Sequence, residues 1–248
     1  MLPAQRRQAI LRAVRSGTAH VTALADEFGV SEMTVRRDLH ALARDGKLER
    51  VRGGAVNVES ERPFSEIAVE RLEAKDRIGR AAAALVEDGQ TVMIDIGTTT
   101  LQAARHLRGR SLTVITTNLA AYEELLPEPQ IELVLPGGVV RRNYRSLVGM
   151  FAEDALRRLR ADIAFLGTSG IDGDLAVWDT TMIEVPIKRA MIAASQRTVL
   201  LADAAKFDMD AMVRVCDASE LDAIVTDERV PAKRRRALHR AGVEVIVA

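Results

Sequence analysis

Three short segments at the start of the chain place apolar residues at the spacing of an α-helix. The first covers residues 3–15, and the second covers residues 21–28 and ends at Gly29, a residue that readily adopts the left-handed conformation that closes a helix. Ser31 is positioned to cap the third helix. The buried stripe of this third helix is predicted to be Val35, Leu39 and Leu42. The pattern therefore predicts three helices, the last two joined by a tight turn.

Two short β-prone runs follow the third helix. Residues 48–52 and 55–58 are joined by a double glycine that starts at Gly53 and permits the positive φ angles of a tight hairpin. Arg50 and Arg52 lie on one face of the first strand, because side chains in a strand alternate with a period of two. The segment therefore predicts a β-wing whose arginines reach phosphate or the minor groove beside the third helix.

The positions of the third helix outside its buried stripe carry polar, basic and hydroxyl groups. In a helix-turn-helix the second helix of the pair enters the major groove with its N-terminal residues against base edges, while other side chains bind phosphates. Two arginines alone are as easily a solvated helix face, and the wing makes DNA binding the favoured interpretation. Asp38 is expected to hold an arginine or a backbone group, because phosphate repels an acid. The residues expected at the DNA are Ser31, Glu32, Met33, Thr34, Arg36, Arg37, Arg50, Arg52 and Gly53.

From residue 75 onward, apolar strands alternate with helices. The strands expected are residues 91–94, 112–115, 131–135, a run ending at Leu166, and 243–247. Such alternation implies a largely parallel sheet covered by helices on both faces. The chain is therefore predicted to be an α/β protein in three parts: a winged helix-turn-helix over residues 1–58, a linker with room for a short helix over residues 59–74, and an effector-binding α/β domain over residues 75–248.

Charge is distributed unevenly between these parts. The whole chain of 248 residues has 35 basic and 35 acidic side chains and a net charge of zero. Residues 1–58 hold ten basic and six acidic side chains, which leaves +4 in this part and −4 in the remainder. A basic small domain joined to an acidic large one suits a protein that docks one end on a phosphate backbone.

Composition excludes several classes of protein. With 48% hydrophobic and 28% charged residues, the chain is typical of a packed protein and too apolar for a disordered one. The one cysteine, Cys216, cannot form an internal disulfide, and the chain opens with basic residues where a signal peptide has an apolar run. No stretch approaches the roughly 20 uninterrupted apolar residues of a membrane span. We therefore expect a cytoplasmic protein without a membrane role.

Polar and glycine clusters follow four of the predicted strands. They are residues 97–100, 116–118, 137–142 and 167–170. Ligands bind in the crevice beyond the carboxyl ends of parallel strands. Gly97 opens a helix with three threonines, whose free N–H groups and positive dipole end favour a bound anion. Threonines at a helix start are often plain caps, and the convergence of four loops is what favours a phosphate site.

These motifs closely resemble the DeoR family of bacterial transcription regulators. The matching N-terminal runs are Arg6-Arg7-Gln8-Ala9-Ile10-Leu11, Phe28-Gly29-Val30-Ser31, Thr34-Val35-Arg36-Arg37-Asp38-Leu39 and Arg52-Gly53-Gly54-Ala55. The likeness continues in Asp95-x-Gly97-Thr98-Thr99, Thr117-Asn118, Gly137-Gly138, Glu184, Lys188, and Asp203 with Lys206-Phe207. It covers nearly the whole chain and implies that the helix starting at Ser31 is the DNA-recognition helix.

The resemblance also implies an effector domain with a fold similar to sugar-phosphate isomerases, which binds phosphorylated sugars or polyols that release the repressor from DNA. The residues expected to bind the effector are Asp95, Gly97, Thr98, Thr99, Thr100, Thr117, Asn118, Gly138, Arg141, Gly170, Glu184 and Lys206. Two alternatives remain open. Lys206 could instead pair with Asp203, and Arg141 could belong to a solvated basic loop with Arg142 and Arg145.

Part of the sensor region resembles the glycerol-3-phosphate repressor branch of this family. The matching runs are Ile94-Asp95-Ile96-Gly97-Thr98-Thr99 and Ser169-Gly170-Ile171-Asp172. Residues 174–179 form a shorter stretch than is usual in that branch, and Thr180-Thr181-Met182 replaces its aromatic residue and histidine. The resemblance therefore implies a phosphorylated effector without naming it.

The residues leave three functions to compare: a sugar-phosphate-responsive repressor, an isomerase-like enzyme carrying a DNA-binding head, and a constitutive DNA-binding protein with a degenerate pocket. An enzyme does not need the head, and the four histidines have neither metal-ligand nor base-and-nucleophile spacing. No metal or cofactor is expected. Because one recognition helix covers too few base pairs for genomic specificity, we expect a homodimer or homotetramer. The favoured function is a repressor and not an enzyme.

Overall fold

The computed structural model describes residues 3–15, 21–44, 48–51, 54–56, 63–207, 209 and 211–248. The chain divides into two compact units, Met1–Arg62 and Pro63–Ala248, each with its own apolar core. The division falls inside the interval 59–74, and helix α4 (Phe64–Val69) begins directly after it. None of the helices in the described ranges is long and apolar enough to span a bilayer.

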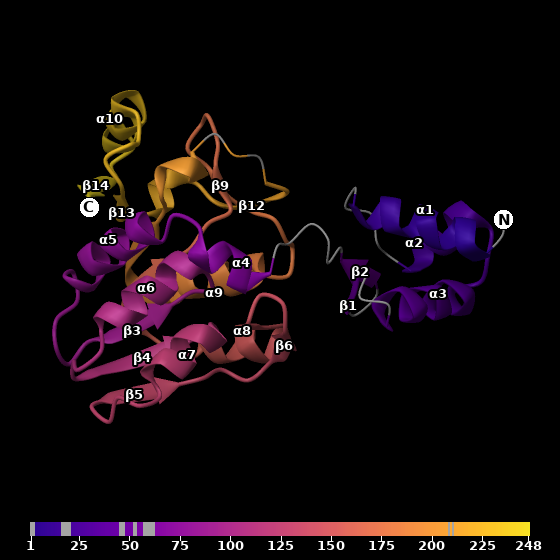
Figure 1. Ribbon diagram of the computed structural model, residues 1–248, viewed down its shortest axis with the longest axis horizontal. Helices are drawn as coiled ribbons and strands as arrows, with labels where there is room; N and C mark the ends of the chain where they lie inside the picture. Colours follow the sequence, from indigo (N-terminus) through magenta and orange to yellow (C-terminus); the bar gives the residue numbers. More distant parts are fainter. Residues whose placement is uncertain are drawn as a thin grey trace. The chain divides into compact units, whose positions relative to one another are not determined.

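The first unit consists of three helices and a two-stranded antiparallel hairpin (Figure 1). Its elements are α1 (Pro3–Arg15), α2 (Val21–Phe28), α3 (Glu32–Arg44), β1 (Glu49–Val51) and β2 (Gly54–Val56). Gly29 adopts a φ of +60° between α2 and α3, the left-handed conformation that the sequence predicts for this turn. The core includes Ile10, Leu24, Val35, Leu39 and Leu48. This is the element order of a winged helix-turn-helix.

The second unit is built on a seven-stranded parallel sheet with the order β14-β13-β11-β8-β3-β4-β5. In that order the strands are Glu244–Val247, Ala223–Thr226, Ser195–Leu201, Ala161–Leu166, Thr91–Ile94, Leu112–Thr116 and Ile131–Val134. The predicted fold class is confirmed. The strand order runs outward in both directions from the neighbours β3 and β8, and such a reversal opens a crevice at the carboxyl ends of the two strands.

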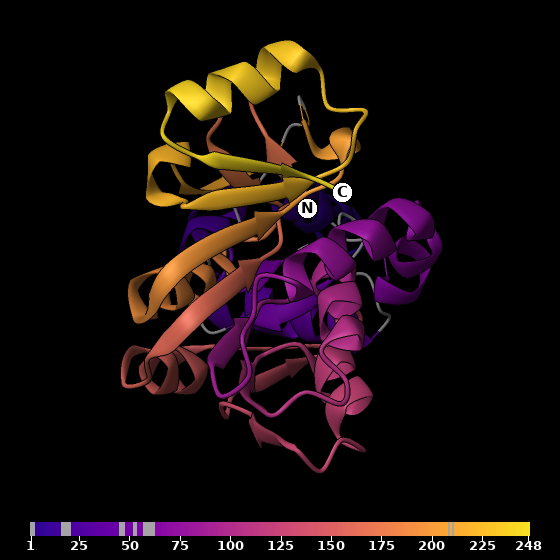
Figure 2. The same cartoon turned by 90° about the vertical axis from the view of Figure 1, so that its left-hand side faces the viewer.

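Helices cover both faces of this sheet. They are α5 (Leu72–Ala83), α6 (Thr98–His106), α7 (Leu119–Leu125), α8 (Met150–Arg157), α9 (Val185–Ala194) and α10 (Ala232–Arg240). Val92 and Ile94 of β3 share a core with α5, α6 and α7, while Met93 between them shares the other core with α8, α9 and α10. In Figure 2 the magenta and orange helices lie on opposite sides of the strands. The period of two in each strand therefore produces a three-layer unit.

Short antiparallel elements follow the strands, in addition to those that the pattern predicts. They are the hairpin of β6 (Val139–Arg141) and β7 (Ser146–Val148), and a three-stranded sheet of β9 (Gly170–Ile171), β10 (Val177–Asp179) and β12 (Val213–Cys216). The 3-10 turns are η1 (Ala204–Lys206) and η2 (Ala218–Glu220). Helix α5 begins at Leu72, earlier than residue 75, because Arg71 takes a left-handed φ of 49° that separates it from α4.

Candidate functional site

A glycine turn opens α6 at the carboxyl end of β3. Gly97 has a φ of +134°, a conformation that favours glycine. The hydroxyl of Thr100 donates to the carbonyl oxygens of Asp95 at 2.8 Å and Gly97 at 2.9 Å, which closes the turn from behind. The first amides of a helix have no intrahelical acceptor and carry the positive end of its dipole. The turn can therefore receive an anion at Gly97, Thr98 and Thr99.

A pocket lies at this turn. Its polar lining residues are Arg71, Lys75, Gly97, Thr98, Thr99, Tyr144, Gly167, Thr168, Ser169, Asp179, Lys188 and Lys206, and its apolar ones are Ile67, Ile96 and Leu201. Gly79 lets α5 approach α6 closely, since a Cβ atom there would stand 2.6 Å from the backbone carbonyl carbon of Gln102. This contact brings Lys75 of α5 to the start of α6. The pocket thus combines a helix N-terminus with four cations.

Two of these cations are neutralised within the fold. Arg71 donates from Nε to Oδ2 of Asp203 at 3.1 Å. Lys188 forms an ion pair with Asp95 and a longer one of 3.4 Å with Asp179. Burial acts to lower the pKa of Lys188, but the two carboxylates outweigh it and hold that pKa above its usual range. Each of these two cations is therefore matched by negative charge within the fold.

The other two cations, Lys75 and Lys206, have no carboxylate within ion-pair distance among the described residues. Lys75 is 1% exposed and donates from Nζ to the carbonyl oxygen of Ile67 at 2.5 Å. Burial lowers the pKa of Lys75 to about 8, and burial also lowers the pKa of Lys206. Asp203 pairs with Arg71 and not with Lys206, although its negative charge still acts on Lys206. A buried ammonium without a carboxylate in direct contact is costly, and an anion in contact with it would relieve that cost.

Some of the predicted effector residues line this pocket, and others support it. Those that line it are Gly97, Thr98, Thr99 and Lys206. Asp95, Thr100 and Asn118 are buried behind the turn. The side chain of Asn118 donates to the carbonyl oxygen of Gly97 at 3.1 Å and accepts from the backbone N–H of Ala120 at 3.0 Å, which caps α7. These three residues therefore hold the shape of the turn.

Arg141 and Glu184 are paired with each other and do not line the pocket. Both are buried, and the hydroxyl of Ser146 donates to Oε1 of Glu184 at 2.7 Å. Burial outweighs the attraction of Arg141 and raises the pKa of Glu184 to about 7. The pair joins the β6–β7 hairpin to the start of α9. Arg141 is therefore not part of a solvated loop.

Thr117, Gly138 and Gly170 also lie away from the lining. The side chain of Thr117 is fully buried. A Cβ atom on Gly138 would stand 2.8 Å from the carbonyl oxygen of Val148, and a Cβ atom on Gly170 would collide with the carbonyl oxygen of Met209. These two glycines permit close approach of backbone segments.

Arg71, Lys75 and Lys188 line the pocket but were not among the predicted effector residues. One signal was present for Lys75. It lies on the buried side of α5 together with Ile78 and Ala82, where an apolar residue is expected. A lysine in an apolar helical stripe is therefore the feature that sequence reasoning could have used.

The predicted DNA-binding face of α3 is exposed. The exposed side chains are Glu32, Met33, Arg36 and Arg37, with Met33 65% exposed. The hydroxyl of Ser31 accepts from the backbone N–H of Thr34 at 3.3 Å and caps the helix. Arg36 forms an exposed ion pair with Glu32 at 3.1 Å. The side chain of Arg50, together with Arg52 and Gly53, lies outside the described part of the chain.

Asp38 is on the buried side of α3. It accepts from Nε of Arg6 at 2.6 Å and from Nε of Arg7 at 3.0 Å. The expectation that Asp38 holds an arginine is confirmed. The two ion pairs fasten α3 to α1.

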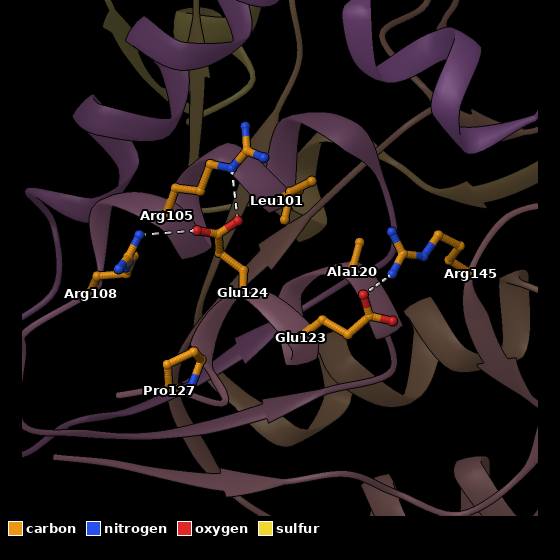
Figure 3. A pocket seen from close by; sticks show the side chains of 8 residues that line it. All are labelled: Leu101, Arg105, Arg108, Ala120, Glu123, Glu124, Pro127 and Arg145. Atoms are coloured by element: carbon orange, nitrogen blue, oxygen red, sulfur yellow. Dashed lines mark hydrogen bonds and ion pairs between the residues drawn. The ribbon is translucent and has the colours of Figure 1, made fainter. Parts of the chain in front are cut away.

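A second depression lies between α6 and α7 (Figure 3). It is lined by Leu101, Arg105, Arg108, Ala120, Glu123, Glu124, Pro127 and Arg145. Arg105 and Arg108 approach Glu124 at 3.1 and 3.4 Å, and Arg145 is paired with Glu123. The charges of this depression are therefore compensated within the fold.

Two family models match the chain. The DeoR-like helix-turn-helix domain covers residues 6–61, and the DeoR C terminal sensor domain covers residues 70–228. The chain is 33% identical to a putative aga operon transcriptional repressor of Escherichia coli O157:H7, over 98% of this chain and 93% of that protein. It is 34% identical to the HTH-type transcriptional regulator GlpR of Haloferax volcanii, over 99% and 98% of the two chains. It is also 34% identical to the glycerol-3-phosphate regulon repressor of Escherichia coli K12, over 96% of each.

Solved structures show a more distant likeness. Ribose 5-phosphate isomerase A from Methanocaldococcus jannaschii is 18% identical, with a TM-score of 0.42 over 56% of this chain and 55% of that one. The two family models together span most of the sequence, and the relatives align with nearly all of it. The chain therefore belongs to the DeoR family of DNA-binding transcription regulators.

Proposed function

We propose that this protein represses a carbohydrate or polyol catabolic operon and that a phosphorylated sugar or polyol releases it from its operator. The observation that carries the proposal is the pocket at the start of α6, where a helix N-terminus meets Lys75 and Lys206. Helix N-termini and cationic side chains are the groups with which proteins bind phosphate. A phosphate monoester carries a charge of about −1.5 to −2 at pH 7, which these two lysines can neutralise.

The rest of the lining suits a polyhydroxylated body. Thr168, Ser169 and Asp179 line the same pocket. Hydroxyl and carboxylate groups are hydrogen-bond partners for the hydroxyls of a sugar or polyol. The glycerol-3-phosphate regulon repressor of Escherichia coli is named for a phosphorylated polyol, which supports this class of effector here.

We further propose that the pocket binds its ligand without converting it. Glu184 has the pKa best suited to proton transfer, at about 7, but it is buried against Arg141 and does not line the pocket. Asp95 is occupied by Lys188. Acids that are engaged in internal ion pairs support binding in preference to catalysis. The three relatives named above are regulators, which supports the same conclusion.

The DNA contacts are proposed to come from the exposed face of α3 and from the wing. Since one recognition helix reads too few base pairs, we propose that two or four copies of the chain bind repeated half-sites. Light scattering of the protein bound to a DNA duplex that it has itself selected from random sequences measures the number of copies. A single copy bound specifically would contradict this part of the proposal.

A thermal-shift screen of the full chain tests the effector class. Sugar and polyol phosphates are compared with their unphosphorylated parents, for example glycerol 3-phosphate with glycerol. A ligand at 100 times its Kd adds about 2.7 kcal/mol to the free energy of unfolding. At least one phosphate should raise the melting temperature and its parent should not. Failure of every phosphate, or turnover of ketose or aldose phosphates at ordinary enzymatic rates, would overturn the proposal.

A further inference from the structure

We infer that helix α4 couples the pocket to the DNA-binding unit, because an anion in the pocket draws Lys75 away from the carbonyl group of Ile67 that it holds. The inference rests on the proposed function, since it requires that the pocket bind the phosphate of the effector. It assigns α4 the role of the element that loosens when the effector binds.

The chain itself places α4 at the junction. The division between the two units falls between Arg62 and Pro63, and α4 begins at Phe64. It is the first helix of the second unit and is followed at once by Arg71 and α5. A change in how α4 is held therefore acts on the segment that leads to the DNA-binding unit.

Both ends of α4 are held by residues that line the pocket. At its start, the ring of Phe64 is buried and meets the ring of Tyr144 edge-on with centroids 6.1 Å apart. The backbone N–H of Phe64 donates to the carbonyl oxygen of Asn143 at 2.9 Å. Near its end, the carbonyl oxygen of Ile67 accepts from Nζ of Lys75. Tyr144, Ile67 and Lys75 all line the pocket, so a ligand there touches the supports of α4.

The contact between Lys75 and Ile67 is the one that an anion competes for. Lys75 is buried, and its hydrogen-bond partner among the described residues is a neutral carbonyl group. The ammonium makes both bonds charge-assisted, but a phosphate oxygen also carries negative charge that attracts the ammonium, whereas the carbonyl group is neutral. A phosphate oxygen within reach of Nζ is therefore the better partner. When it binds, the carbonyl group of Ile67 loses its hydrogen bond from the Lys75 side chain of α5.

Arg71 adds a second point of competition. It forms the corner between α4 and α5 with a left-handed φ of 49°, a conformation that costs free energy in a residue with a side chain. The ion pair between its guanidinium and buried Asp203 holds this corner. Because Arg71 also lines the pocket, a phosphate competes with Asp203 for it. The corner and the end of α4 then relax together.

Hydrogen exchange of the full chain, with and without inorganic phosphate, measures this directly. The peptide that contains residues 97–100 should exchange more slowly when phosphate binds, whereas the peptide that contains residues 64–70 should exchange at least about threefold faster. Slower exchange at 97–100 with unchanged or slower exchange at 64–70 would overturn the inference, while the proposal that the pocket binds phosphate would stand. No change at 97–100 at saturating phosphate would instead contradict the proposed function on which the inference rests.

Two variants separate the coupling from simple ligand binding. Lys75→Met keeps most of the aliphatic side chain and removes the ammonium, so residues 64–70 should exchange faster even without phosphate, and operator DNA should bind about tenfold more weakly, within the usual range of allosteric coupling. Arg108→Met is the control, because it removes an exposed arginine of the depression between α6 and α7, outside the pocket. It should leave phosphate binding, unliganded exchange at 64–70 and operator affinity unchanged. Equal behaviour of the two variants in the absence of phosphate would overturn the inference.

Discussion

The pocket at the start of α6 and the depression between α6 and α7 are both lined by basic side chains, yet they differ in what faces those side chains. In the depression, Arg105 and Arg108 lie against Glu124 of α7. In the pocket, Lys75 and Lys206 have no carboxylate partner among the described residues. The number of basic groups is therefore a poor guide to an anion site, and the absence of a carboxylate within ion-pair distance is a better one.

Burial sharpens the difference. The side chains of Arg105 and Arg108 are 45% and 54% exposed, so solvent screens their ion pairs, and such pairs contribute about 0–1 kcal/mol to stability. Lys75 is almost wholly buried, where an ammonium without a carboxylate in direct contact is costly. The buried ammonium of Lys75 lies in the same pocket as the N-terminal amides of α6, which have no intrahelical acceptor. We interpret that coincidence as the mark of a ligand site.

The largest expected effect comes from removing both free cations. Lys75→Met combined with Lys206→Met should weaken binding of a phosphate ligand about 100-fold, because each hydrogen bond to a charged group contributes about 1.5–3 kcal/mol. The matched control, Arg105→Met combined with Arg108→Met, removes two arginines from the depression and should change the affinity by less than about twofold. Calorimetric titration of both double variants measures the affinities. Equal losses of phosphate affinity in the two double variants would contradict the distinction between the pocket and the depression.

The hydroxyl groups of the turn should contribute less than the cations. Thr98→Ala combined with Thr99→Ala leaves the backbone amides of α6 in place, so we expect phosphate to bind about tenfold more weakly. Ligand concentrations that release the unmodified protein from operator DNA should no longer release the double variant. Operator affinity without ligand should be unchanged. Thr113→Ala, on β4, is the control, and the ligand should release this variant from operator DNA as it releases the unmodified protein. Retained release in the double variant would count against the turn as the phosphate site.

Phosphate affinity should fall as pH rises above about 8. Burial lowers the pKa of Lys75 to about 8, so its ammonium is present below that pH and is lost above it, by up to about tenfold in affinity per pH unit. The burial that lowers the pKa of Lys206 adds to the decline. Titrations at pH 7 and 9 measure it, and Lys75→Met should show a shallower decline. Equal affinity of the unmodified protein at both values would contradict the role of Lys75.

The same pKa shift affects stability in the absence of ligand. The folded state binds fewer protons than the unfolded state between pH 8 and the ordinary lysine pKa of 10.5. The free energy of unfolding therefore gains from Lys75 as pH rises through this window. Denaturant unfolding of the unmodified protein and of Lys75→Met, compared at pH 8 and 10, isolates this contribution. A contribution of opposite sign would contradict the burial of a charged lysine.

The smallest expected effect distinguishes two arginines on α3. Arg36 forms an ion pair with Glu32, while Arg37 is exposed and has no carboxylate partner among the described residues. Each phosphate contact that is lost should reduce the salt dependence of DNA binding by about one unit. We expect Arg37→Ala to show this reduction fully and Arg36→Ala only in part. Unchanged DNA binding in both variants would contradict the assignment of α3 as the recognition helix.

Local patterns in the sequence predict most of the fold and the glycine turn at Gly97 that forms one side of the pocket. The helix start at Ser31, the turn at Gly29 and the strand Thr91–Ile94 each depend on residues that are close together in the chain. The turn at Gly97 is predicted for the same reason, since a buried strand, a glycine and a threonine run are adjacent. Such features are visible without knowledge of the tertiary fold.

The walls of the pocket depend on tertiary contacts that the sequence does not display. Arg141 and Glu184 have charges that suit an effector, but they are 43 positions apart in the chain and neutralise each other in the fold. Lys75 comes to the pocket only because Gly79 lets α5 lie close to α6. Which charges remain without a partner is therefore decided by packing.

Release of operator DNA tests the central claim most directly. Fluorescence anisotropy follows the full chain on a labelled duplex that it has selected, while sugar and polyol phosphates and their unphosphorylated parents are added. The pocket at Gly97, Lys75 and Lys206 predicts that at least one phosphate monoester releases the DNA and that its parent does not. For the Lys75→Met, Lys206→Met double variant, adding the phosphate should leave its operator affinity where it stands without ligand. Release by the parent compounds at equal concentrations, or full release of the double variant, would contradict the account.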